Sequence, residues 1–105
     1  MVHMFINVWM VNKLSLKNIF PQHKFNNTVE EQLSKVLEEL VEAEQDMLNN
    51  NKEHMAEELI DVMNATANCL YKLGFNDTYI ENKIRYVKHK NEVRGYYDGV
   101  KPYER

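Results

Sequence analysis

Four acidic residues in the middle of the chain have the spacing of a metal site. Glu39 and Glu42 lie three residues apart, as do Glu58 and Asp61, and residues three apart on a helix lie on the same face. If the two helices pack antiparallel, the two pairs face each other and form a cage of four carboxylates. Such oxygen ligands suit Mg²⁺ or Mn²⁺, and Mg²⁺ bound in this way usually also takes phosphate oxygens of a substrate.

The same acids have a second interpretation, the water-exposed face of an amphipathic helix. Such faces usually mix charges of both signs at a spacing of four residues. Here Glu38 and Glu42 are a like-charge pair, and only Lys35 lies within reach to offset them. Asp61 is the only charged residue between positions 59 and 71, and it either faces water, pairs with a base from another helix or binds a metal. Because a carboxylate near an apolar surface is costly unless it is neutralised, we favour the metal site.

Other metal and nucleophile chemistries find no support in the sequence. Di-iron carboxylate bundles need Glu three residues before His, whereas Asn51 precedes His54 and Tyr86 precedes His89 at that spacing. We expect His54 to be a surface residue in the first turn of its helix and Cys69 to be buried and inert. There is no Cys/His cluster for zinc, no nucleophile elbow and no glycine-rich phosphate loop.

Charge is unevenly distributed along the chain. Residues 30–61 hold eleven acids against two lysines, about −9, and residues 83–105 hold seven bases against three acids, about +4. An acidic middle segment repels nucleic acid, whose binding needs clustered cations. In the basic segment, Lys88, Asn91 and Arg94 lie on one helix face and can hold phosphate oxygens; the alternative is a solvated helix end that complements the helix dipole.

Length and composition indicate a single globular domain spanning residues 1–105. The chain has 44% hydrophobic and 28% charged residues, and its three glycines and two prolines make an all-β sandwich unlikely. The single cysteine fits a reducing compartment. The apolar run over residues 4–11 is too short to span a membrane, and no signal-peptide pattern accompanies it. We therefore expect a soluble cytoplasmic protein.

Helix signals predict an all-α, four-helix bundle. Thr28 and Glu31 have the form of a capping box that opens a helix, and three asparagines at 49–51 break it. A second helix follows over about 52–73, before Gly74, and a third is expected from a capping box at Thr78 to about residue 95. An N-terminal helix over about 5–19 is the weakest of the four.

The helix over 28–49 carries an apolar stripe. Its members recur at helical spacing: Val29, Leu33, Val36, Leu37, Leu40, Met47 and Leu48.

The run Glu38-Glu39-Leu40-Val41-Glu42, followed by Glu58-Leu59-Ile60-Asp61, has the form E-E-x-x-E…E-x-x-D. It resembles the signature of the MazG-like, all-α nucleoside triphosphate pyrophosphatase superfamily, which includes dimeric dUTPases, dCTP pyrophosphatases and phosphoribosyl-ATP pyrophosphatases. Gln32 and Lys35 precede the acids as in Q-x-x-K-x-x-E-E forms. The tail from Lys88 to Tyr97 is similar to the basic C-terminal helix end of these proteins. The resemblance covers roughly residues 28–97.

The resemblance implies a Mg²⁺-dependent hydrolase, with Mn²⁺ as the alternative cofactor, that cleaves an NTP or dNTP to NMP and pyrophosphate. It implies Mg²⁺ ligands at Glu39, Glu42, Glu58 and Asp61. Glu38 would assist as a second-metal ligand or by orienting the attacking water. It implies phosphate or substrate binding by Lys88, Asn91, Arg94 and Lys35.

Two further expectations concern the base pocket and the assembly. Trp9 and His23 are candidates for the base pocket, although aromatic residues near an N-terminus more often belong to the core. The apolar surface of three long helices exceeds what a chain of this size buries alone, and the resemblance implies a homodimer or a dimer of dimers. The alternatives are a non-enzymatic helical interaction module and a small nucleic-acid-binding protein.

Overall fold

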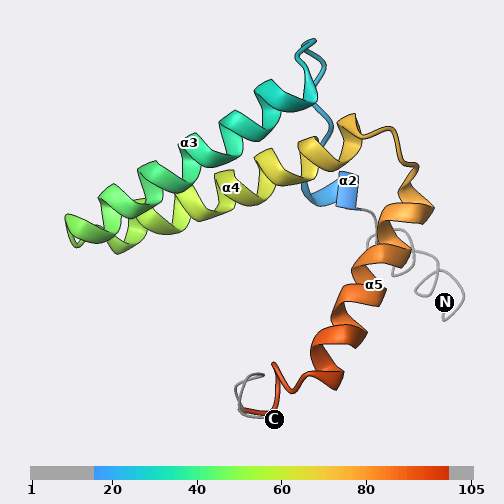
Figure 1. Ribbon diagram of the computed structural model, residues 1–105. Coiled ribbons are helices and arrows are strands. Elements are labelled where there is room, and N and C mark those ends of the chain that lie inside the picture. Colours follow the sequence, from blue (N-terminus) through green and yellow to red (C-terminus); the bar gives the residue numbers. More distant parts are fainter. Residues whose placement is uncertain (1–15, 100–105) are drawn as a thin grey trace, which may run out of the picture. The chain divides into compact units, whose positions relative to one another are not determined.

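The computed structural model describes residues 16–99, and the described part of the chain is helical without strands. Its elements are α2 (Leu16–Ile19), α3 (Val29–Leu48), α4 (Lys52–Lys72) and α5 (Asp77–Val93) (Figure 1). The all-α prediction is confirmed. Within the described residues, each helix is too short or too polar to cross a lipid bilayer.

The chain divides into two compact units, one up to Phe75 and one from Asn76 onward. The first holds α2, α3 and α4, and the second holds α5. The single domain expected over residues 1–105 stays a prediction. Of the N-terminal helix expected over 5–19, only the part from Leu16 lies within the described residues.

Helix α3 begins where the sequence predicts. The Thr28 hydroxyl accepts a hydrogen bond from the Glu31 backbone N–H at 3.1 Å, and the Glu31 carboxylate accepts one from the Thr28 N–H at 3.0 Å. This reciprocal pair satisfies two of the backbone donors that a helix start leaves unpaired. The predicted capping box is confirmed.

The turn between α3 and α4 is made of three asparagines, as predicted. Asn49 is the C-cap of α3, Asn50 has a positive φ of 57°, and the Asn51 side chain accepts a hydrogen bond from the His54 N–H at 3.2 Å. Asparagine tolerates the left-handed conformation better than other residues with a side chain. The turn is short, so α3 and α4 run antiparallel side by side (Figure 1).

The start of α5 differs from the prediction. Its N-cap is Asn76, whose side chain accepts a hydrogen bond from the Tyr79 N–H at 2.8 Å, so the helix begins at Asp77 and the predicted capping box at Thr78 is wrong. Asparagine is at least as strong an N-cap as threonine, and it comes first along the chain. The helix ends at Val93, before Gly95 with its positive φ of 82°, as predicted.

The interface between α3 and α4 is unusually polar. Its buried residues on α3 are Gln32, Val36, Glu39 and Ala43, and those of α4 include Glu58, Ala65 and Asn68. Gln32 and Asn68 are each only 1% exposed. The Gln32 side chain donates to the Ala65 carbonyl at 3.0 Å and accepts from the Asn27 side chain at 2.9 Å. Because these polar groups are paired, their burial is not prohibitive.

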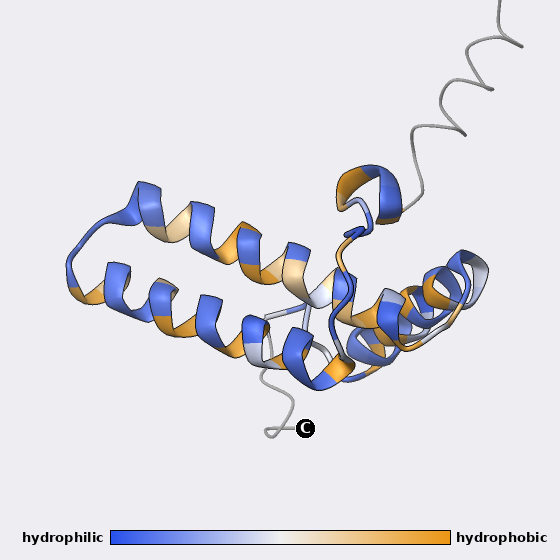
Figure 2. Ribbon diagram, turned by 90° about the horizontal axis from the view of Figure 1, so that it is seen from above, coloured by the Kyte–Doolittle hydropathy of each residue, from blue (hydrophilic) through white to orange (hydrophobic). Residues whose placement is uncertain are grey.

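Most of the apolar stripe of α3 is exposed. Of its members only Val36 is buried, whereas Leu37 is 58% exposed and Leu33 is 52% exposed. Leu59, Ile60 and Met63 of α4 are exposed too, and hydrophobic residues recur along both helices (Figure 2). Small and polar residues therefore occupy the interface between the two helices, and most of the stripe lies outside it.

Side-chain hydrogen bonds connect the loop before α3 to α4. The Asn68 side chain accepts from the His23 N–H at 2.7 Å and donates to the Pro21 carbonyl at 3.2 Å. The Tyr71 hydroxyl donates to the Phe20 carbonyl at 2.8 Å. These contacts join segments more than forty positions apart and fix the loop over the hairpin.

We expect Gln32→Ala to lower the free energy of unfolding by about 1–3 kcal/mol, because it leaves buried hydrogen-bonding groups without their partner. The measurement is urea denaturation followed by circular dichroism. Gln45→Ala on the exposed side of α3 is the matched control and should change stability by less than about 0.5 kcal/mol. Equal effects of the two changes would contradict a structural role for the buried amide.

Candidate metal centre

Three of the predicted metal ligands come together between α3 and α4. One carboxylate oxygen from each of Glu39, Glu58 and Asp61 lies within 4.8 Å of the other two. Glu39 comes from α3, and Glu58 and Asp61 come from successive turns of α4. The antiparallel hairpin thus places the two halves of the acidic motif opposite each other, as the spacing predicts.

Two of these carboxylates are removed from water. Glu39 is 7% exposed and Glu58 is 9% exposed, whereas Asp61 is exposed at the edge of the cluster. Glu58 Oε2 is buried and has no hydrogen-bond partner among the described residues. A buried carboxylate oxygen without a partner is costly, and a cation is the partner that best suits it.

The pKa values of the two buried carboxyl groups move in opposite directions. Burial, then the neighbouring carboxyl groups of Glu39 and Glu42, raise the pKa of Glu58 from 4.5 to about 7. Burial also acts to raise the pKa of Glu39, but hydrogen bonds with Lys35 and Glu58 outweigh it, so that this pKa is lowered. Two like charges so close together cannot both persist without a proton or a cation between them.

The other predicted acids and Lys35 lie at the border of this cluster. Glu42 is exposed and outside the group of three, although it is near enough to affect the pKa of Glu58. Glu38 is exposed, and Lys35 Nζ lies 3.6 Å from Glu38 Oε1 and 3.0 Å from Glu39 Oε1. Lys35 therefore neutralises the motif's own acids here, and the hydrogen bond with Glu39 raises the pKa of its ammonium group.

The sequence reasoning missed a second group beside the first. His54 Nδ1 lies 2.7 Å from Asp46 Oδ2, and His54 Nε2 lies 3.7 Å from Glu58 Oε1. The prediction that His54 is exposed in the first helical turn is confirmed, but this residue also has specific partners. The hydrogen bond with Asp46 raises the pKa of His54. The short asparagine turn is the sequence feature that could have predicted this group, because it brings the last turn of α3 beside the first turn of α4.

The base-pocket candidates have different outcomes. Trp9 lies outside the described residues. The His23 ring stacks on Phe25 with a centroid distance of 4.7 Å, and its Nε2 lies 3.5 Å from the Asn64 side chain. His23 Nδ1 and Asn27 Oδ1 are buried without a hydrogen-bond partner among the described residues. The loop thus holds two buried polar atoms whose hydrogen-bonding capacity is not used within the described part of the chain.

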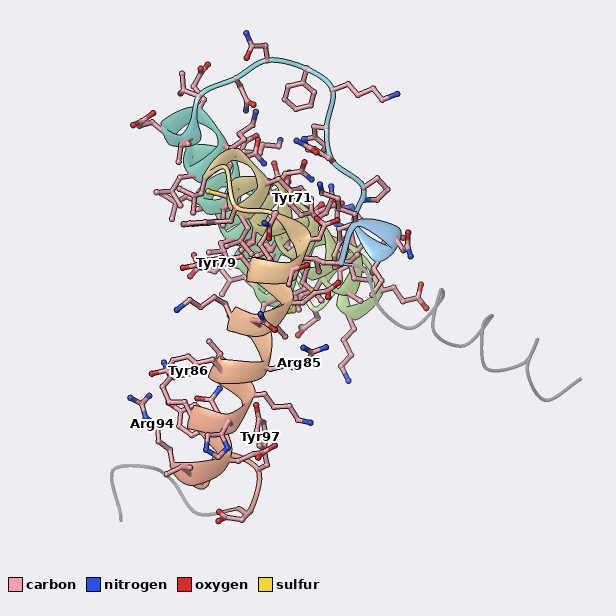
Figure 3. All side chains as sticks on the ribbon, turned by 90° about the vertical axis from the view of Figure 1, so that its right-hand side faces the viewer. Tyr71, Tyr79, Arg85, Tyr86, Arg94 and Tyr97 are labelled. Atoms are coloured by element: carbon pink, nitrogen blue, oxygen red, sulfur yellow. The ribbon has the colours of Figure 1, made fainter. Side chains whose placement is uncertain are left out.

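Three of the four residues predicted to bind phosphate or substrate belong to the second unit. Lys88 and Asn91 lie on α5. Arg94, which is labelled in Figure 3, is the C-cap of this helix. Lys88 and Arg94 are exposed, and Lys88 Nζ lies 3.9 Å from Glu92 Oε1. Their common position near the end of α5 fits both earlier interpretations, phosphate binding and complementation of the helix dipole.

Cys69 of α4 was expected to be buried, but it is half-buried.

The donor set of the cluster fits a hard divalent cation. All three converging ligands are carboxylate oxygens, which Mg²⁺ and Mn²⁺ prefer, and the exposed side at Asp61 leaves room for waters or substrate oxygens.

Scans against protein-family models, curated proteins and solved structures find no match for this chain. The resemblance to MazG-like enzymes therefore rests on the motif residues themselves.

The raised pKa of Glu58 predicts a pH-dependent stability of the metal-free chain. This group binds its proton more tightly when folded, so its contribution to stability is fully present below about pH 4.5 and is lost as the pH rises through about 7. We expect Glu58→Gln to raise the metal-free melting temperature at pH 8 relative to the unmodified chain, with a smaller difference at pH 5. The measurement is thermal melting in EDTA. Glu57→Gln is the control, because Glu57 is exposed, and a Glu58→Gln melting temperature at or below that of the unmodified chain at pH 8 would contradict the assignment.

Proposed function

We propose that this chain is a Mg²⁺-dependent nucleoside triphosphate pyrophosphohydrolase. The observation that carries the proposal is the convergence of Glu39, Glu58 and Asp61, with one buried oxygen of Glu58 unpartnered. The burial of two carboxylates, one of them with an unpartnered oxygen, lowers the stability of the fold. Such a cost in stability is typical of a ligand site. The motif's resemblance to MazG-like enzymes supplies the reaction.

In the proposed reaction the oxygen of a water molecule attacks the α-phosphorus of the nucleotide. The bond from this phosphorus to the oxygen bridging the α- and β-phosphates breaks, and NMP and pyrophosphate leave. Bound Mg²⁺ supplies charge neutralisation of the phosphates and makes water a better nucleophile. Glu39, Glu58 and Asp61 hold the cation, with Glu42 beside them.

The remaining polar residues have roles that follow from their exposure. Glu38 is exposed next to the buried acids and is the carboxylate placed to orient the attacking water and take its proton. Lys35 contacts both Glu38 and Glu39, so it holds the two carboxylates in position until phosphate oxygens compete for its ammonium group. Lys88, Asn91 and Arg94 are the proposed phosphate contacts of the second unit, and Trp9 and His23 are the proposed base contacts.

The first test is a pyrophosphate-release assay with Mg²⁺ over the ribo- and deoxyribonucleoside triphosphates. We expect NMP and pyrophosphate from the unmodified chain and a loss of more than about 100-fold in Glu58→Gln, since even the partners of metal ligands cost about 10–100-fold when removed. Glu57→Gln should retain the activity. No release from any nucleotide, together with no Mg²⁺-dependent rise in melting temperature, would instead favour the non-enzymatic interaction module.

We also propose that the exposed apolar face of the α3–α4 hairpin packs against a second copy of this chain. The face includes Leu33 and Leu37 of α3 and Leu59 and Met63 of α4, all of them exposed. Faces of this extent usually mark an interaction site. A second copy presents the same face by symmetry, and this self-complementarity is what a two-fold interface requires.

Leu37→Glu should weaken this association because it places a charge in the centre of the apolar face. We expect sedimentation equilibrium to give at least twice the 12.5 kDa chain mass for the unmodified protein and the mass of one chain for Leu37→Glu. Gln45→Glu introduces the same residue on an already polar position of α3 and should leave the mass unchanged. A single-chain mass for the unmodified protein at micromolar concentration would overturn the proposal and indicate another occupant for the face.

A further inference from the structure

His54 adds a nitrogen donor to a cluster otherwise made of carboxylates. Its Nε2 lies 3.7 Å from Glu58 Oε1, while its Nδ1 lies 2.7 Å from Asp46 Oδ2. The distance from Nδ1 to Asp46 is that of a hydrogen bond, and the distance from Nε2 to Glu58 is too long for one. The ring is therefore fixed on one side and leaves its second nitrogen directed at a buried carboxyl group.

This arrangement matches a known way of preparing histidine for a metal. A metal-binding histidine usually donates its other ring N–H to a carboxylate, which sets the tautomer and the ring orientation. Asp46 is placed to accept from Nδ1, which leaves the Nε2 lone pair available. Two ligands of one tetrahedral ion with bonds of about 2.1 Å lie about 3.4 Å apart, close to the separation of Nε2 and Oε1.

Glu58 belongs to two groups at once. It joins Glu39 and Asp61 in the carboxylate cluster, and it joins Asp46 and His54 in the second group, in each case with ligand atoms within 4.8 Å of one another. Its Oε2 is unpartnered and the residue is nine-tenths buried. A carboxylate has two oxygens, and one such group can serve two neighbouring cations.

We propose that His54, oriented by Asp46, and Glu58 form a second cation subsite that takes a borderline divalent transition metal such as Co²⁺ or Zn²⁺. Imidazole suits such ions, whereas Mg²⁺ favours oxygen ligands. The inference rests on the proposed function, because Glu58 serves both subsites. The carboxylate subsite binds Mg²⁺, and the histidine subsite binds the softer ion, with water or substrate oxygens completing its coordination.

The test is a titration with Co²⁺ at pH 8, followed by its visible absorption and by the imidazole proton signals of His54, beside Mg²⁺-dependent thermal melting. We expect His54→Gln to lose one equivalent of Co²⁺ and to keep the rise in melting temperature with Mg²⁺. Asp46→Asn leaves the histidine in place and should weaken Co²⁺ binding about 10–100-fold. His89→Gln, which removes an exposed histidine of α5, is the control and should bind as the unmodified chain does.

The outcomes separate this inference from the proposed function. If His54→Gln binds as many equivalents of Co²⁺ as the unmodified chain, with the same spectrum, the histidine subsite is wrong and the carboxylate site stands. If Mg²⁺ does not raise the melting temperature of the unmodified chain while Co²⁺ binding still depends on His54, the proposed carboxylate site is wrong and the histidine subsite stands. Circular dichroism of His54→Gln and Asp46→Asn establishes that both remain folded.

Discussion

The meeting of Glu39 and Glu58 between two helices is the constraint on which the rest of the hairpin depends. Two carboxyl groups removed from water and within 4.8 Å of each other and of Asp61 are stable only with a proton or a cation. The raised pKa of Glu58 and the lowered pKa of Glu39 correspond to the first case, in which a proton neutralises one of the two groups. A divalent cation is the second case, and in the proposed reaction the cation replaces this proton.

Because carboxylates occupy part of the interface between α3 and α4, other contacts must stabilise the packing of these two helices. Alanines at 43 and 65 let the helices approach closely, and Gln32 forms a hydrogen bond from α3 to the backbone of α4. Asn68 then connects α4 to the loop before α3 through two hydrogen bonds. Hydrogen bonds between fixed partners are directional, so this interface sets the register of the helices more narrowly than apolar contacts of the same area would.

The sequence predicts the local features well because they depend on neighbouring residues. The Thr28 capping box, the asparagine break and the convergence of Glu39 with Glu58 and Asp61 all follow from spacing and helix geometry. The surface that covers the apolar stripe could not be predicted, because hydrophobic periodicity identifies an apolar face but not its partner. The start of α5 was misjudged because two competing caps lie two residues apart, and the partners of His54 depend on a turn geometry that periodicity does not contain.

The buried acids and the exposed apolar residues are different side chains of the same two helices, so the proposed chemistry and the proposed association use separate faces. Glu39 faces the interface between α3 and α4, whereas Leu37 faces away from it. Substitutions can therefore accumulate on the outer face without moving a carboxylate, and the reverse holds as well. Under the proposed function, the quaternary architecture is thus free to change while the set of acidic residues stays the same.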